Sequence, residues 1–264
     1  MRQKDYFVLP YGTAGPGWEA DEGEMVGIKQ CRKHIRLVRG GPMDIIFRPL
    51  EAEDIPKLLP YFALRSNVTC DSTIFDSYLW RKYYQVEYAI VDEHILLMKM
   101  QEDGVHYAAL PICAEEYLKE GFDLLKDYFH REMKTELRIY DADEKGLEVL
   151  GLDPGEYIVE ELSDYADYIY DAECLRTLAG KKYHKKKNNV NAFARGYEGR
   201  WEYRRLGQDA REEIWNFLKS WEENKEENVE EHLEAEVSGL RDYLDHMDKF
   251  SAVMAGIRID GRRA

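Results

Sequence analysis

Three short apolar segments that follow one another closely limit the possible folds most strongly. They span Val86–Val91, His94–Met100 and Val105–Leu110, and each has the residue types and length of a β-strand. Asp92–Glu93 separates the first two segments, and Asp103–Gly104 precedes the third. Because such dipeptides are typical of tight turns, the sequence predicts a three-stranded meander.

Helix-like and strand-like patterns surround this meander and complete a first unit. The other predicted elements are a strand at 44–48, helices at 53–62 and around Tyr78, a helix at 114–133, a strand at 136–140, a helix at 144–150, and strands at 157–162 and 165–170. Their order is strand, two helices, three strands, helix, strand, helix, two strands. This mixture predicts an α+β (mixed α/β) fold.

A second unit begins once this order is complete. Arg200–Leu206 has a strand pattern, two helical patterns follow it, and Ala252–Ile259 has a strand pattern that ends in a hairpin turn. A chain of 264 residues is long enough for two ordinary cores. The order of strands and helices in the second unit stops at a point where that of the first unit continues. We therefore expect one complete unit followed by a truncated one. Its last strand should have an open edge that further sequence or another chain would cover.

The first 42 residues differ from the rest, since they are rich in glycine and show few periodic apolar positions. We expect a poorly ordered leader there, with Met43 as a candidate for the true start. The predicted domains are therefore the leader at 1–42, the first unit at 43–172, and a basic linker helix with the incomplete second unit at 173–264.

Charge is distributed very unevenly along the chain. The whole protein has a formal net charge of -15, yet Lys181–Arg205 contains nine Lys and Arg residues against two Glu. Asp209–Asp248 contains fourteen acidic residues against four basic ones. The negative electrostatic field of the whole protein argues against general nucleic-acid binding, but a local basic patch can still bind phosphate.

Cysteine usage and hydropathy exclude several classes of protein. The four cysteines are far apart and form no CxxC pair, so no zinc knuckle or redox motif is predicted, and no metal site is expected. No apolar run approaches the length of a membrane span, and no signal-peptide pattern is present. We therefore expect a cytoplasmic protein. The sequence does not indicate an oligomeric state.

The basic run Lys181–Phe193, KKYHKKKNNVNAF, is the clearest candidate for ligand contact. As a helix it would turn an apolar side toward a core, formed by Tyr183, Val190, Phe193, Ala194 and Tyr197. The candidate contacts to an anion are Lys182, Lys185 and Lys186 for charge, Asn188 and Asn189 for hydrogen bonds, and His184, whose side chain type titrates near neutral pH. A solvated helix that offsets the acidic segment explains the same charges, and both interpretations stay open.

Three stretches resemble one known family. They are YADYIYDAECLRTLAGKKYHKKKNNVNAF (165–193), CDSTIFDSYLWRKYYQVEYAI (70–90) and IIFRPLEAEDIPKLLPYF near the start. They are similar to the soluble family named for the C-terminal domain of phosphatidylglycerol lysyltransferase, and the resemblance extends from Met43 to the end. The element order of the first unit likewise resembles the GNAT acyltransferase fold.

The resemblance implies two GNAT units in tandem and the transfer of an acyl or aminoacyl group. The donor in the lysyltransferase relatives is an aminoacyl-tRNA and the acceptor is a membrane lipid. Aminoacyl-tRNA and acyl-CoA are thus the candidate donors, and a tRNA acceptor end, acyl-CoA or a lipid head group is the candidate anionic ligand. The R/Q-x-x-G-x-G/A loop of CoA-using members is absent after Leu110, which argues against ordinary CoA binding by the first unit.

Asp71, Tyr78 and Trp80 lie in the second family-like stretch. They could line a pocket between the units, although core packing is the better explanation for the two aromatic residues. No catalytic residue can be assigned, and no metalloprotease, hydrolase or phosphate-loop motif is present.

Two functions from different classes follow from these observations. The first is an acyl- or aminoacyltransferase in which the basic helix meets an anionic donor or acceptor at the junction of the two units. The truncated second unit would leave such a chain incomplete as an enzyme. The alternative is a non-catalytic binding or assembly module that retains the GNAT fold.

Overall fold

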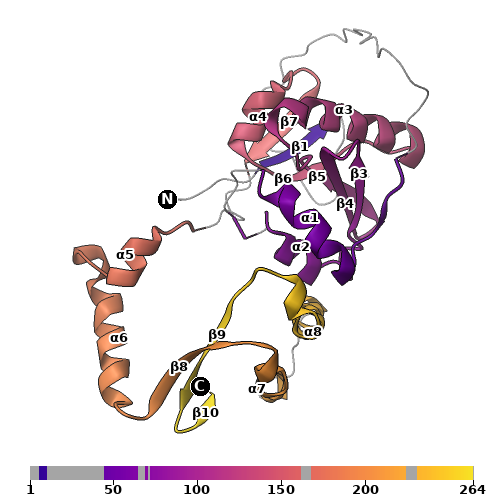
Figure 1. The fold of residues 1–264 in the computed structure, drawn as a ribbon. Coiled ribbons are helices and arrows are strands. Elements are labelled where there is room, and N and C mark those ends of the chain that lie inside the picture. Colours follow the sequence, from indigo (N-terminus) through magenta and orange to yellow (C-terminus); the bar gives the residue numbers. More distant parts are fainter. Residues whose placement is uncertain are drawn as a thin grey trace.

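The computed structural model describes residues 6–10, 45–64, 69–70, 72–161, 168–223 and 231–263. Its first and larger layer consists of a seven-stranded sheet and the helices that cover it. The strand order of this sheet is β2-β3-β4-β5-β6-β1-β7 (Figure 1). The strands are β1 (Tyr6–Pro10), β2 (Arg48–Pro49), β3 (Glu87–Val91), β4 (Ile95–Glu102), β5 (Val105–Ala109), β6 (Ile139–Ala142) and β7 (Tyr157–Glu161). Neighbouring strands are antiparallel except β5 and β6, which run parallel.

Both faces of this sheet are covered by helices. The helices are α1 (Ile55–Phe62), α2 (Ile74–Leu79), α3 (Leu118–Tyr128) and α4 (Glu144–Leu150). Successive side chains of β4 point to opposite faces. Ile95 and Leu97 pack in a cluster with α3 and α4, whereas Leu96 and Met98 pack in a cluster with α1 and α2. The fully apolar start of β4 is therefore explained by burial on both sides.

A smaller antiparallel sheet of order β10-β9-β8 forms the second layer. Its elements are β8 (Trp201–Leu206), α7 (Arg211–Glu223), α8 (Glu231–Asp245), β9 (Met254–Ile259) and β10 (Arg262–Arg263). Leu206, Ile214 and Leu244 form part of its small buried core. The hairpin between β9 and β10 turns at Asp260 and Gly261, both with positive φ.

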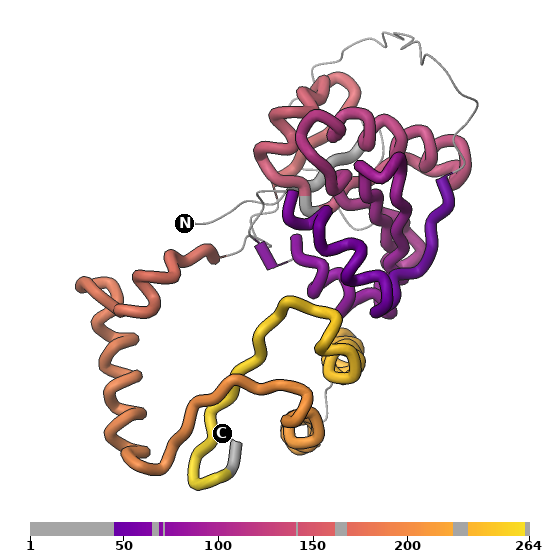
Figure 2. Tube along the Cα trace, viewed as in Figure 1, coloured from indigo at the N-terminus to yellow at the C-terminus, as the bar shows by residue number. Residues whose placement is uncertain are grey.

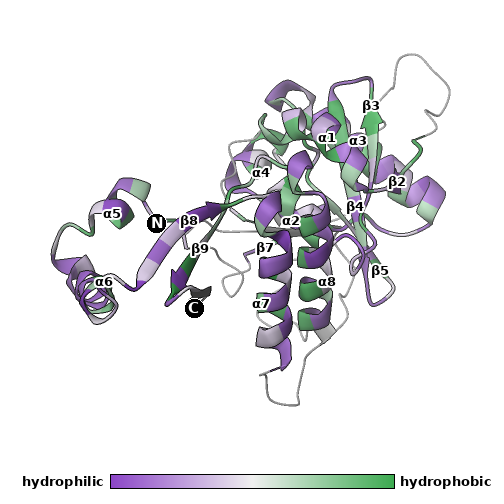
Figure 3. Ribbon diagram, turned by 60° about the horizontal axis from the view of Figure 1, so that its bottom comes forward, coloured by the Kyte–Doolittle hydropathy of each residue, from purple (hydrophilic) through white to green (hydrophobic). Residues whose placement is uncertain are grey.

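The two layers are joined by α5 (Ala172–Thr177) and α6 (His184–Gly196). Figure 2 shows the chain running from α5 through α6 into β8, far from the seven-stranded sheet. The chain then returns, and α8 lies against α2. Figure 3 shows α6 as a largely hydrophilic helix, separate from the paired helices α7 and α8.

The contact between α8 and α2 is unusually close. A Cβ atom built on Gly239 of α8 would lie 2.2 Å from the carbonyl oxygen of Leu79. Beside this contact, rings from both layers meet edge to face, with centroid distances of 4.8 Å for Phe75–Tyr243 and 4.9 Å for Tyr78–Phe250. Phe250 packs against the α1–α2 cluster and against the core of the second layer.

Most predicted elements are confirmed. The meander forms β3, β4 and β5, and its turns contain positive φ angles at Asp92, Glu93, Asp103 and Gly104. The mixed α/β class with mostly antiparallel sheets is also confirmed. No described helix is long and apolar enough to cross a membrane.

Three predictions differ from the structure. Of the predicted strand at 44–48, residues 45–47 belong to no strand, and β2 begins only at Arg48. Residues 168–170 belong to no named strand, while 162–167 lie outside the described residues, so the predicted strand at 165–170 is not supported. Tyr6–Pro10 lies in the leader predicted to be poorly ordered, yet it forms β1 between β6 and β7. Five residues with apolar side chains can complete a sheet when both neighbouring strands supply backbone partners. The rest of the leader, 1–5 and 11–42, lies outside the described residues.

Gly239→Ala should destabilise the protein. The added methyl group would contact a backbone oxygen that cannot rotate away, so α8 would have to move from α2. We expect the free energy of unfolding to fall by about 1–3 kcal/mol, despite the better helix propensity of alanine. Urea denaturation of this variant and of Ser238→Ala, an exposed neighbour on α8, measures the effect. Equal stability of the two variants would contradict the close contact.

Candidate functional site

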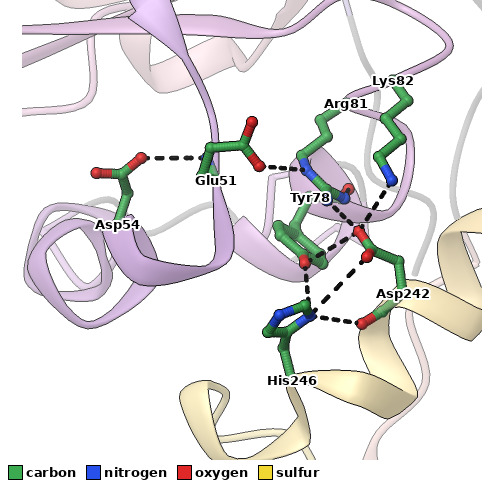
Figure 4. A network of polar contacts seen from close by, with 7 residues as sticks. All are labelled: Glu51, Asp54, Tyr78, Arg81, Lys82, Asp242 and His246. Carbon is green, nitrogen blue, oxygen red and sulfur yellow. Dashed lines mark hydrogen bonds and ion pairs between the residues drawn. The ribbon is translucent and has the colours of Figure 1, made fainter.

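Four polar side chains meet where α8 packs on α2 (Figure 4). Tyr78 is in the last turn of α2, and Arg81 follows that helix by two residues. Asp242 is near the end of α8, and His246 directly follows its last residue. Because residues four apart lie on the same side of a helix, Asp242 and His246 both point toward Tyr78. The site is thus built from both layers.

Asp242 is the centre of this group. Its carboxylate accepts hydrogen bonds from Arg81 Nη2 and from Tyr78 Oη, the latter at 3.1 Å, and Lys82 Nζ lies 3.6 Å away. Partial burial acts to raise the pKa of Asp242, but the hydrogen bond and positive charge of Arg81, with help from Lys82, bring this pKa below its ordinary value. Asp242 is therefore held as an anion.

Arg81 is almost completely buried, with 5% of its side chain exposed. Its Nη1 donates to the carbonyl oxygen of Tyr78 at 3.0 Å, and its guanidinium carbon lies 3.7 Å from the centre of the Tyr78 ring. Glu51 adds a weaker ion pair at 3.9 Å. A buried cation is stable only when it is paired and hydrogen-bonded, and Asp242 supplies most of this compensation.

Tyr78 is fully buried, and its burial strongly raises the pKa of its hydroxyl group. It therefore keeps its proton and donates to Asp242. His246 is partly exposed, and its Nδ1 lies 2.9 Å from the carbonyl oxygen of Asp242 and 3.3 Å from Tyr78 Oη. In the neutral tautomer with the proton on Nδ1, that atom donates to the carbonyl oxygen and Nε2 is left with a lone pair. His246 is thus the group here that combines solvent access with proton-transfer chemistry.

An aromatic group lies beside this network. The rings of Trp80, Tyr83 and Tyr84 contact one another. The ring centre of His232 in α8 lies 4.9 Å from that of Tyr83 and 6.5 Å from that of Trp80. Tyr83 Oη is 3.3 Å from His232 Nε2. Trp80 therefore contacts α8 from the first layer, as Tyr78 does.

The predicted basic residues lie elsewhere. Lys185, Lys186, Asn188 and Asn189 are exposed on α6, as is His184, whose Nδ1 is 3.5 Å from Asn188 Nδ2. Lys182 lies just before this helix, with its ammonium group 4.9 Å from the centre of the Tyr183 ring. In the described part of the chain, no acidic side chain forms an ion pair with these lysines. Figures 1 and 3 both place α6 apart from α2 and α8, so the basic residues do not join Tyr78 and Trp80.

The predicted apolar side of this helix is only partly correct. Tyr183 is buried, and Phe193, Ala194 and Tyr197 are half-buried, with Phe193 packed on Trp201 at 5.7 Å. Val190, however, is 55% exposed, and it belongs to none of the buried clusters in the described part of the chain. Asp71 lies outside the described residues.

The comparisons with known proteins now give the family. The family model described as "Phosphatidylglycerol lysyltransferase, C-terminal" matches residues 62–264. The chain belongs to this family. A solved structure from Bacteroides thetaiotaomicron VPI-5482, described as a conserved protein of unknown function, is similar in fold, with a TM-score of 0.75 and 21% identity, covering 83% of this chain and 73% of that one. No curated protein matches the chain.

In this member of the lysyltransferase C-terminal family, sequence reasoning missed Arg81, Asp242 and His246. One signal was present, since Asp242 and His246 are four residues apart in a helical pattern. That spacing is common on exposed helices. It indicates a site only because the structure shows that Tyr78 and Arg81 face Asp242 and His246.

The segment between β5 and α3, which lacks the R/Q-x-x-G-x-G/A pattern, forms backbone hydrogen bonds with β4. The Ile112 amide donates to the Leu96 carbonyl oxygen at 2.9 Å, and the Leu96 amide donates to the Ile112 carbonyl oxygen at 3.1 Å. Ile112 and Cys113 are also buried. The Ile112 amide is therefore already used within the protein. Among the described residues, no group of three or more His, Cys, Asp and Glu side chains could hold a metal ion.

Asp242→Asn should be strongly destabilising. The amide keeps the shape of the side chain but removes the charge that compensates Arg81, so a buried cation loses its main partner. We expect a loss of about 3 kcal/mol in the free energy of unfolding at neutral pH. Chemical denaturation measures it, with Asp245→Asn as the control. Asp245 pairs with Arg211 at the surface, and its loss should cost less than about 1 kcal/mol.

The same pair predicts how stability depends on pH. Because the pKa of Asp242 is lowered in the folded state, its contribution is present above the unfolded pKa and is lost as the pH falls through the folded pKa. The difference between the wild type and Asp242→Asn should therefore shrink in acid. A difference that stays constant from neutral to acid pH would contradict this role of Asp242.

Proposed function

We propose that the protein is an acyl- or aminoacyltransferase that moves an acyl or aminoacyl group from an activated donor to an amine or hydroxyl acceptor. The match of residues 62–264 to the phosphatidylglycerol lysyltransferase C-terminal family carries this proposal. The family name describes an aminoacyl transfer, and the match includes the junction between the layers and the basic helix.

The proposed architecture is two GNAT units in tandem. In support, β2, α1, α2, β3 and β4 have the same order of element types as β8, α7, α8, β9 and β10. The parallel pair β5–β6 in an otherwise antiparallel sheet also resembles the GNAT arrangement. The second unit would then repeat the beginning of the first.

The proposed chemistry assigns proton transfer to His246. The nitrogen or oxygen of the acceptor bonds to the donor carbonyl carbon, and the donor ester or thioester bond breaks. His246 Nε2 takes the proton that the acceptor loses and returns it to the leaving group. Asp242 and Tyr78 do not reach substrate in this scheme, and they position the imidazole through its Nδ1 side.

The separation of α6 from His246 favours a long, polyanionic donor (Figure 1). A small ligand cannot touch both places, whereas the acceptor arm of an aminoacyl-tRNA can place its phosphates on Lys182, Lys185 and Lys186 while its ester reaches the junction. The internal use of the Ile112 amide argues against acyl-CoA as the donor.

Binding measurements test the role of the basic helix. Radiolabelled aminoacyl-tRNA, acyl-CoA and anionic lipid vesicles are each titrated with the wild type, with Lys182/Lys185/Lys186→Ala and with Lys57/Lys119/Lys145→Ala as a control of equal charge change. We expect the first triple variant alone to weaken tRNA binding and to reduce the slope of log affinity against log salt by up to about 3. Equal binding by the two triple variants would exclude the basic helix as the donor contact.

His246→Gln tests the proposed chemistry. Loss of a general base should lower the rate of group transfer by about 10²–10⁴-fold, with little effect on donor binding. His232→Gln, which changes a histidine within α8, should retain most of the rate. Donor binding without any transfer by the wild type would instead favour a non-catalytic binding module. Transfer that does not depend on His246 would remove this residue from the mechanism.

A further inference from the structure

Strand β8 forms one edge of the three-stranded sheet. One side of β8 pairs with β9 from Trp201 to Leu206, and within the described residues its other side pairs with no strand. Such an edge presents unpaired backbone N–H and C=O groups that can bind another strand. Two large side chains beside this edge are exposed, Trp201 to 40% and Tyr203 to 61%.

The other sheet edges are protected in ways that β8 is not. Strands β2 and β10 have two residues each, and β2 contains Pro49. Strand β7 is longer, but it has two exposed glutamates, Glu160 and Glu161, and no basic residue. Pairing two copies through β7 therefore cannot match opposite charges. Short edges, proline and like charges all discourage strand pairing.

The sequence of β8, WEYRRL, is complementary to itself when two copies run antiparallel. A two-fold axis through Tyr203 sets Glu202 of each copy opposite Arg204 of the other, and Trp201 opposite Arg205. An axis through Glu202 or Arg204 would instead set like charges face to face. Opposite charges and cation–aromatic pairs stabilise neighbouring strands, whereas like charges destabilise them.

We propose that two copies of this chain associate through β8, in the register centred on Tyr203, to form a continuous six-stranded sheet. Each contact then occurs twice, as two-fold symmetry requires. The proposal goes beyond the transferase function and does not depend on it.

Arg204 supplies independent support. Its guanidinium reaches Asp209 and Glu213 only at 3.8 and 3.9 Å, and Arg258 makes the closer, two-pronged contact with Glu213. Arg204 Nε is buried and has no hydrogen-bond partner among the described residues. The Arg204 side chain is 34% exposed and its Nη2 contacts within one copy are long, so Glu202 of a second copy would add a partner at the accessible end of the guanidinium group.

Two effects weaken this dimer. The strand contact is short, so we expect association that depends on concentration in the micromolar range rather than a permanent dimer. The basic helices α6 also repel each other, but each is attached near Trp201. Antiparallel pairing places these ends at opposite limits of the joined strands, which keeps the two helices apart.

Sedimentation velocity of the full chain over a concentration series tests the dimer. Glu202→Arg and Arg204→Glu each create two like-charge pairs, so each variant alone should associate at least about tenfold more weakly than the wild type. An equimolar mixture of the two variants restores opposite charges at both positions, and it should dimerise as heterodimers. Glu198→Arg makes the same charge change outside the strand and should behave as the wild type.

A monomeric wild type throughout the series would overturn the proposal. So would dimerisation of both single variants as tight as that of the wild type, or a mixture that stays monomeric although circular dichroism shows both variants folded. Should a variant unfold, hydrogen exchange of the wild type decides the matter. Amide protection in β8 should then rise with protein concentration, and unchanged protection would exclude the β8 interface.

Discussion

The buried charge of Arg81 is the constraint on which the arrangement of the two layers depends. Its main anionic partner, Asp242, lies 161 residues further along the chain and belongs to the other layer. A buried ion pair adds little net stability compared with apolar packing, but leaving one partner alone is costly. The pair therefore specifies where α8 lies on α2. The same contact brings His246 to the Tyr78 hydroxyl group, so the candidate site follows from the way the layers are fixed.

Local signals in the sequence predict much of the fold. The meander and the helix at 144–150 are predicted correctly because turn residues and helix caps act over a few positions. Strand β1 is different, since its five residues gain order from β6 and β7, which come much later in the chain. The exposed side of Val190 has a similar cause. Periodicity shows which residues of a helix share a side, but not whether a core lies beside it.

The candidate site is predicted less well than the fold for the same physical reason. The basic run is visible as a charge pattern, and Tyr78 was identified within a family-like stretch. Neither signal shows that Tyr78 faces Asp242, because that contact joins two residues 164 positions apart, in layers that are connected through α5 and α6. The chemistry of the junction arises from packing over long sequence distances, which patterns within one segment do not report.

Phe250 has a consequence for how the protein melts. Its ring belongs to the apolar cluster under α1 and α2 and also to the core of the second layer. If either cluster unfolds, the Phe250 ring loses contacts that also stabilise the other cluster. The close approach of Gly239 in α8 to Leu79 in α2 holds the two layers together at the same interface. Although the sheets are separate, both should therefore unfold together on heating, in one cooperative transition. No intermediate in which only one layer is folded should be populated.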